Sequence, residues 1–211
     1  MKKNFLLLFL MCLLGGMSSS LLAQFDLTYN QGTKSQYTLT FTPIEGNECA
    51  VQMKKGNGPS ENIDMVIPAT VEYNSTTYTV VKIPNNAFSG ASTYLGTAAD
   101  YFTSLTIPNT VTTISSNAFK YWVNCTTVTL GEGVTSISNN AFANSTAITT
   151  IYCYAETPPT CGGNSVFTST VKNNATVYVP ANSIDDYKKE TTSGYSWAYI
   201  KTNNFKAISS T

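Results

Sequence analysis

The feature that most constrains this chain is a phrase that occurs twice at a fixed interval. Residues 105–119 (LTIPNTVTTISSNAF) match residues 128–142 (VTLGEGVTSISNNAF) with a shift of 23 positions, and eight of the fifteen positions are identical. All the large apolar positions recur, whereas the residues between them are mainly Thr, Ser, Asn and Gly. A constant period of roughly 20 to 30 residues is typical of a solenoid, in which each repeat forms one coil.

Each repeat opens with one strand pattern and continues with a second. The form apolar-x-x-apolar-x-apolar starts at Phe102, recurs at Cys125 and recurs again at Ile148, always with the same interval. Alternate side chains of a strand point to opposite faces, so we expect the apolar residues to face the core and the residues between them to face water. Turn-forming Pro-Asn and Gly-Glu-Gly sequences follow the first two strands. Val111 and Ile114 then indicate a short extended run across the coil.

The Ala-Phe pair that ends each repeat is predicted to be a wedge in the core. Its alanine allows a close approach of the backbone, and the ring of Phe119 or Phe142 is expected to fill the corner between strand and turn. The asparagine before each pair is expected to cap a short helical turn, because its side-chain oxygen can accept a backbone N–H. These asparagines are Asn86, Asn117 and Asn140.

The units on either side are less regular, and about four coils are expected in total. An earlier copy takes an insertion and resumes at residues 83–88. The third copy becomes irregular at residues 157–159 and recovers at residues 166–167. A strand at residues 177–179 is predicted to close the series.

The repeat region, residues 64–179, is expected to be covered at both ends. A terminal coil would otherwise expose an apolar layer and an unpaired strand edge. Alternating apolar residues at 37–41 and 49–53 predict strands of an N-terminal β cap over residues 24–63. Residues 180–211 are assigned to a C-terminal cap.

The C-terminal cap is predicted to contain one short helix. Ser183 and Asp186 have the spacing of a capping box, which predicts a helix that runs through Lys189. The residues expected to complete this cap are Trp197, Ile200 and Ile208.

Residues 1–23 have the three regions of a secretory signal peptide. Two lysines precede an apolar core over residues 5–14, and small or polar residues lead to a cleavage site near Ala23. The apolar run is shorter than the roughly 20 residues that span a bilayer. We therefore expect a secreted or cell-surface protein with no integral membrane segment after signal removal. A lipid anchor on Cys12 is the alternative, although Met11 stands where a small residue is wanted.

The chain lacks the residue types that several catalytic and ligand-binding mechanisms need. The chain has no histidine, and all its positively charged side chains are lysines. A Ser-His-Asp nucleophile therefore lacks its base, a zinc site lacks its commonest nitrogen ligand, and bidentate arginine clamps on phosphate cannot form. Without the two leader lysines the chain is slightly acidic, which does not attract nucleic acid. No enzyme activity, cofactor or metal site is predicted.

Cys49, Cys125, Cys153 and Cys161 remain after removal of the leader. An even count in an oxidising compartment favours disulfides, whereas Cys125 and Cys153 also fit as small core residues. These two occupy opposite ends of their strands, about 16 Å apart at about 3.3 Å per residue. Bonded cysteines need Cα atoms within about 7 Å, which leaves Cys153 with Cys161 as the one local pair to consider.

The repeats resemble a known family. IPNTVTTISSNAF and LGEGVTSISNNAF are similar to the BspA-type leucine-rich repeat, a class of bacterial cell-surface proteins, and the resemblance extends from about Asp64 to the segment ATVYVPANSIDDYKK. It implies a leucine-rich-repeat solenoid, that is, a short right-handed β/α superhelix with parallel strands. It also implies an exported protein that acts in adhesion or ligand binding, and it supplies no catalytic residues to carry over.

The outward positions of successive strands are the first candidate binding surface. Thr106, Thr129 and Tyr152 succeed one another at the interval of the repeat, and Tyr178 follows after a slightly longer one. We expect these residues to stand side by side, with Tyr154 nearby. Phenol rings beside rows of hydroxyls suit a neutral partner such as a sugar or an extended peptide, and Tyr offers a large contact area at low entropic cost. The alternative is that they are ordinary cross-strand residues of a sheet.

A second candidate is the pair Tyr121-Trp122 in a connecting loop. An exposed Trp there would be a contact residue, whereas the alternative places it beneath its own loop. Together these patterns favour an exported, non-catalytic binding or adhesion module for an extracellular protein or glycan ligand. The alternative function is a structural or assembly component of an envelope complex, and the sequence does not fix the oligomeric state.

Overall fold

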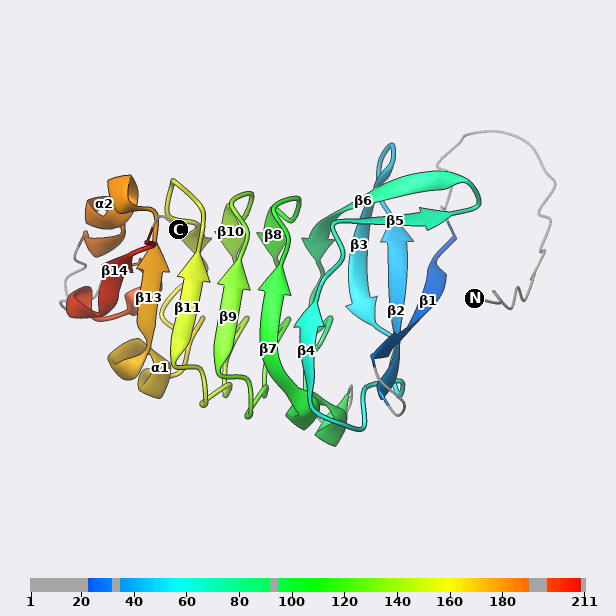
Figure 1. The fold of residues 1–211 in the computed structure, drawn as a ribbon, viewed down its shortest axis with the longest axis horizontal. Coiled ribbons are helices and arrows are strands. Elements are labelled where there is room, and N and C mark those ends of the chain that lie inside the picture. Colours follow the sequence, from blue (N-terminus) through cyan, green and yellow to red (C-terminus); the bar gives the residue numbers. More distant parts are fainter. Residues whose placement is uncertain (1–22, 32–34, 92–94, 190–196, 210–211) are drawn as a thin grey trace.

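The chain winds into successive coils that stack along one axis (Figure 1). The computed structural model describes residues 23–31, 35–91, 95–189 and 197–209. Residues 1–22 of the predicted signal peptide, with the alternative anchor Cys12, lie outside the described residues. Within the described ranges the strands form two sheets, one of six strands and one of eight.

The six-stranded sheet contains the strand that opens each coil. Its order is β14-β13-β11-β9-β7-β4, and each neighbouring pair is parallel. Leu105 lies opposite Val128, and Val128 lies opposite Ile151, so the interval of the sequence repeat is the register of this sheet. The predicted parallel strands are therefore confirmed. Their bounds are β4 (Ile63–Val66), β7 (Phe102–Ile107), β9 (Thr127–Leu130), β11 (Thr150–Cys153), β13 (Thr176–Val179) and β14 (Phe205–Ala207).

The second sheet contains the second extended run of each coil. The short strands β8 (Thr113–Ile114), β10 (Ser136–Ile137) and β12 (Thr160–Cys161) pair in parallel. At one end of this row, β8 pairs in parallel with β6 (Thr76–Ile83). The predicted run across the coil is confirmed, and β12 shows that it also forms in the irregular third copy.

The second sheet becomes antiparallel toward the N-terminus. β1 (Phe25–Gln31) pairs with β2 (Ser35–Pro43), and β2 pairs with β3 (Glu48–Met53), both antiparallel. β3 then joins β6 in parallel, which attaches these strands to the coils. The strands predicted at residues 37–41 and 49–53 are confirmed as parts of β2 and β3. The limits of the two caps and the handedness of the superhelix stay predictions.

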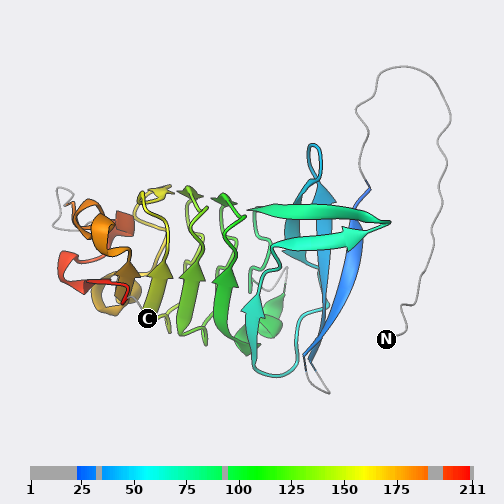
Figure 2. The same cartoon turned by 45° about the horizontal axis from the view of Figure 1, so that its top comes forward.

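The insertion in the early copy forms a hairpin. β5 (Thr70–Tyr73) pairs antiparallel with β6, and Asn74 and Ser75 between them have φ values of 48° and 60°. Two consecutive residues with positive φ are what a two-residue type I′ turn requires. The ring of Tyr73 stacks on Phe25 with 4.2 Å between centroids, so this hairpin packs against β1 (Figure 2).

The rings of the three Ala-Phe pairs, together with Phe167, which follows Val166, form a continuous stack through the core. The distances between neighbouring ring centroids are 5.3 Å for Phe88–Phe119, 5.4 Å for Phe119–Phe142 and 5.1 Å for Phe142–Phe167. Neighbouring planes lie within 15° of parallel, and all four rings are buried. The predicted wedge is confirmed: each coil offers its neighbour the same surface, and aromatic pairs at such distances add to the free energy of burial.

The asparagine before each Ala-Phe pair is a turn residue and not a helix cap. Asn86, Asn117 and Asn140 have φ values of 59°, 57° and 59°, in turns that are not helical. Asn tolerates this left-handed backbone better than most residues. The tight turn allows backbone hydrogen bonds between coils. For example, the Phe119 N–H donates to the Ala141 carbonyl of the next coil at 2.8 Å. The prediction of a capped helical turn is wrong because the turn ends before a helix can form.

The C-terminal part adds two short helices and one more strand. The predicted helix is confirmed as α2 (Ile184–Lys188), but the Ser183 side chain makes no capping hydrogen bond, so the capping-box prediction is wrong. Ser183 already has helical backbone angles because a 3-10 turn runs directly into α2. β14 lies beyond β13, which corrects the prediction that residues 177–179 close the series. The remaining helices are α1 (Ser169–Asn174) and the 3-10 turns η1 (Gly96–Tyr101), η2 (Ala181–Ser183), η3 (Trp197–Tyr199) and η4 (Thr202–Asn204).

Trp197 packs into the C-terminal core, as predicted. Its ring meets Tyr187 with 5.4 Å between centroids, and its indole N–H donates to the Pro159 carbonyl at 2.9 Å. Ile200 is buried, whereas Ile208 is only partly covered. These contacts tie the irregular segment after β11 to the end of the chain.

The ring stack predicts a large cost for truncating one of its members. Phe119→Ala removes a fully buried ring that contacts a ring on each side, and we expect it to lower the free energy of unfolding by about 3 to 5 kcal/mol. Chemical denaturation measures this change. Tyr154→Ala, which truncates an exposed ring, is the matched control and should cost less than about 0.5 kcal/mol. Equal stability of the two variants would contradict the packing described above.

Candidate binding surface

The structure brings the predicted outward residues into one row. Thr106 lies opposite Thr129, Thr129 opposite Tyr152, and Tyr152 opposite Tyr178. The rings of Tyr152 and Tyr178 stack with 4.9 Å between centroids and 15° between planes. The prediction that these side chains stand side by side is therefore confirmed, and their role in binding stays a prediction.

A second outward row lies two residues earlier on the same strands and was missed from the sequence. It consists of Ser104, Thr127, Thr150 and Thr176, which pair in succession. The signal that would have found it is the alternation of the strand itself, because residues two apart share a face. We use the name strand face for these two rows together with Tyr154. Tyr154 follows Tyr152 by two positions and is 43% exposed.

Charged side chains border the strand face at its two ends. Lys206 on β14 lies opposite Tyr178, and Asp64 on β4 lies opposite Ser104. Asp64 accepts a hydrogen bond from the Ser104 hydroxyl at 2.7 Å. Within the rows of β7, β9, β11 and β13 the outward residues are neutral. A partner that spans these strands therefore meets hydroxyls and phenol rings and not charge.

The loop candidate divides into one exposed and one buried ring. Tyr121 is 38% exposed, and the Lys120 ammonium lies 5.0 Å from the centre of its ring. Trp122 is only 1% exposed and stacks on Phe102 with 4.2 Å between centroids. Its indole N–H donates to the carbonyl of Phe88 at 2.6 Å. The interpretation of Trp122 as a contact residue is therefore wrong, and the alternative that it lies beneath its own loop is confirmed.

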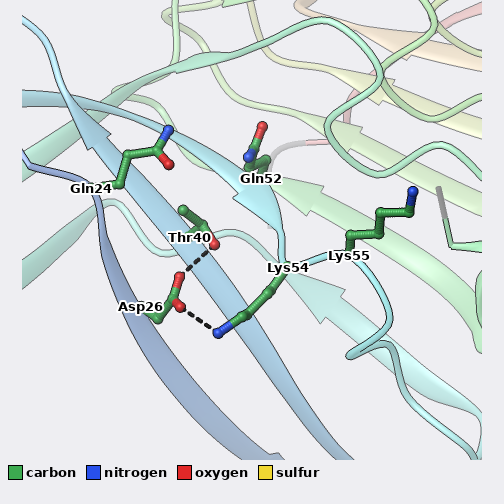
Figure 3. Close-up of a pocket in the computed structure, with 6 residues that line it drawn as sticks. All are labelled: Gln24, Asp26, Thr40, Gln52, Lys54 and Lys55. Carbon is green, nitrogen blue, oxygen red and sulfur yellow. Dashed lines mark hydrogen bonds and ion pairs between the residues drawn. The ribbon is translucent and has the colours of Figure 1, made fainter. Parts of the chain in front are cut away.

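A polar hollow on β1–β3 is a further surface feature (Figure 3). It measures about 530 Å³ and is lined by Gln24, Asp26, Thr40, Gln52, Lys54 and Lys55. Asp26 accepts hydrogen bonds from the Thr40 hydroxyl at 2.5 Å and from the Lys54 ammonium at 2.7 Å. Burial raises the pKa of Asp26, but these two hydrogen bonds and the positive charge of Lys54 together outweigh it and hold that pKa below its ordinary value. Because these groups satisfy one another, the hollow is a weaker candidate than the strand face.

The four cysteines of the described chain are free thiols. Cys125 and Cys153 are separate core residues, as predicted, and no bond joins Cys153 to Cys161. Burial raises the pKa of Cys49 to about 11, and burial also raises the pKa of Cys125 and of Cys161 to about 12. Burial likewise raises the pKa of Cys153, whose sulfur lies 3.2 Å from the Tyr187 hydroxyl oxygen. A thiol must ionise to act as a nucleophile, so these are packing residues.

In the described part of the chain, no three His, Cys, Asp or Glu side chains lie close enough together to hold a metal ion. Among the helices of the same ranges, none is both long enough and apolar enough to cross a bilayer.

Comparison with known proteins agrees with the repeat geometry. The family model described as the BspA type leucine rich repeat region matches residues 82–210 in six copies. The predicted bounds of the repeat region and the predicted number of coils stay predictions. Among curated proteins the chain has no match.

Two solved structures are similar to this chain. A leucine-rich repeat protein from Bacteroides capillosus ATCC 29799 is 22% identical, with a TM-score of 0.53, and the alignment covers 73% of this chain and 99% of that protein. A leucine rich cell surface protein from Faecalibacterium prausnitzii A2-165 is 24% identical, with a TM-score of 0.44 over 74% of this chain. The present chain spans 37% of the length of that second protein. The first similarity shows a common leucine-rich-repeat fold.

The raised pKa values of the thiols predict their reactivity. In the folded chain from residue 24 onward at pH 8, less than about one thiol in a thousand is ionised at Cys49, Cys125 or Cys161, so dithiobisnitrobenzoate should react very slowly. After unfolding in guanidinium chloride all four thiols should react at once, as absorbance of the released thiolate shows. Rapid reaction of the folded protein would contradict the structure, and so would the finding of only two reactive thiols after unfolding.

Proposed function

The chain belongs to the BspA-type leucine-rich repeat family, and from this premise we propose that it is a non-catalytic binding or adhesion module, secreted or held at the cell surface, whose strand face takes a glycan or protein ligand. The observation that carries the proposal is the register of Thr106, Thr129, Tyr152 and Tyr178 on neighbouring strands. The pattern of residues 1–23 supports export.

The strand face suits binding because it is organised before a ligand arrives. Its side chains rise from paired parallel strands, and the contact between Tyr152 and Tyr178 restricts both rings. Side chains that are already ordered lose less conformational entropy on binding, so more of the contact energy appears as affinity. Loop residues such as Tyr121 lack this advantage.

A structural or assembly role in an envelope complex is the second candidate function. The observation that favours it is the position of β1 at the end of the eight-stranded sheet, where it pairs with β2. The outer edge of a terminal strand presents backbone N–H and C=O groups that another chain can pair with. This role would use β1 and would leave the strand face uninvolved.

A double substitution on the strand face separates the two functions. Tyr152→Ala with Tyr178→Ala should weaken binding to a glycan or matrix-protein ligand by roughly 30-fold or more, because truncation of central aromatic contacts costs about 2 kcal/mol or more. Binding of the purified chain to immobilised glycans and matrix proteins measures the loss. Tyr121→Ala, which truncates an exposed ring elsewhere, is the matched control and should bind normally. A chain that shows no ligand but co-purifies with a stable partner would support the assembly role instead.

A further inference from the structure

Threonines in the coils serve two different purposes, and the first is structural. The Thr135 hydroxyl donates to the Thr112 carbonyl at 3.1 Å, and the Thr160 hydroxyl donates to the Thr135 carbonyl at 3.1 Å. Thr126 and Thr149 repeat this bond on the other side of the coil, each at 3.4 Å to the equivalent residue of the preceding coil. These hydroxyls tie each coil to the one before it, and each spends its one donor in doing so.

The threonines of the strand face are different. Across the described residues, the hydroxyls of Thr106, Thr127, Thr129 and Thr150 make no hydrogen bond to the protein. They belong to the same coils and have the same chemistry as the bonded threonines. Each hydroxyl can donate once and accept twice, so the strand face carries a grid of unused donors and acceptors.

The height of the strand face changes at β11. One side of the Tyr152 ring is covered by Tyr178, and its other side borders Thr129, which is much smaller. Tyr154, two residues beyond Tyr152, adds a further exposed ring on the same face. The outward residues of β7 and β9 thus form a low floor, and Tyr152 of β11, with Tyr154 just after this strand, forms a wall beside it.

We propose that the strand face binds an uncharged glycan, with one sugar ring on the floor at Thr129 and its C–H face against the free side of Tyr152. The inference rests on the proposed function and names its ligand class. A pyranose ring has an apolar C–H face and a rim of hydroxyls, which matches one aromatic wall and a floor of free hydroxyls. In this arrangement the hydroxyls of Thr106, Thr127 and Thr129 bond to the sugar.

The same observations disfavour a protein or a charged polymer. The centre of a protein interface is typically apolar and aromatic, whereas the floor between β7 and β11 is made of Thr and Ser. The charged residues of these rows, Asp64 and Lys206, lie at opposite ends and have opposite sign. An anionic or cationic polymer that spans the face would meet attraction at one end and repulsion at the other. Binding of a neutral glycan should accordingly change little with salt.

The test uses an array of immobilised polysaccharides and proteins. Neutral glucans, mannans and galactans are printed beside polygalacturonate, hyaluronate, gelatin and fibronectin, and the chain from residue 24 onward is applied in 50 mM and 500 mM NaCl. We expect binding to at least one neutral polysaccharide at both salt concentrations. Binding confined to the acidic polysaccharides or to the proteins, or binding to nothing on the array, would overturn the inference.

Two threonine variants separate ligand contact from coil stability. Thr129→Val removes a free hydroxyl and should lower glycan affinity by about 3- to 10-fold with an unchanged melting temperature. Thr135→Val is the matched control, because it removes a hydroxyl that bonds the preceding coil. It should lower the melting temperature and leave the affinity unchanged. The opposite result, with affinity dependent on Thr135 and indifferent to Thr129, would contradict the assignment.

A large side chain at position 129, which would fill the space beside Tyr152, gives the sharpest single test. Thr129→Tyr places a ring where the sugar is proposed to lie, in line with Tyr152 and Tyr178, and should reduce glycan binding at least about 10-fold in a chain that still unfolds cooperatively. If a protein ligand binds and this variant abolishes it, the glycan inference fails and the proposed function stands. If a ligand binds this variant and the Tyr152→Ala, Tyr178→Ala double variant as well as the original chain, the strand face is not the site and both fail.

Discussion

Stacking of one buried phenylalanine ring per coil on the ring of the next coil is the interaction on which the rest of the structure depends. A single coil orders its whole length of backbone around a few apolar side chains, and the conformational entropy of those residues exceeds what the burial returns. Contact between Phe88, Phe119, Phe142 and Phe167 covers the apolar layer of one coil with that of the next. Stability is then shared between neighbours, as in other repeat proteins, and each coil requires the next.

The stack of buried rings also determines which residues lie next to one another on the outer surface of the sheet. Once Leu105 lies opposite Val128, the alternation of the strands places Thr106 opposite Thr129. Selection on the outward residues can proceed without disturbing the core, because the two sets occupy opposite faces of the sheet. The step between Thr129 and Tyr152 is such a change: two adjacent coils share one internal architecture and present different outer surfaces.

Features that recur in every coil could be predicted from the sequence, whereas features that depend on contacts with other parts of the fold could not. Burial forces apolar residues to recur at fixed spacing, so the parallel strands and the Phe119 wedge could be predicted. Trp122 could not be placed, because the path of its loop under Phe88 is a tertiary outcome. The free hydroxyl of Thr129 and the bonded hydroxyl of Thr135 are alike in sequence, and only the position of the carbonyl in the preceding coil distinguishes them. β14 has too few apolar residues to mark it as a strand, and its pairing with β13 supplies the missing stability.

The register of the outward row is the central claim, and disulfide formation between neighbouring strands tests it most directly. Adjacent strands lie about 4.8 Å apart, within the range in which two cysteines can bond. A chain carrying Thr106→Cys and Thr129→Cys should cross-link on mild oxidation, as peptide mass spectrometry detects, because these positions face each other. A chain carrying Ser104→Cys and Thr129→Cys should cross-link far less, because these two positions lie two residues out of register. Preferential cross-linking of the displaced pair would show that the coils stack in a different register and that the strand face does not exist.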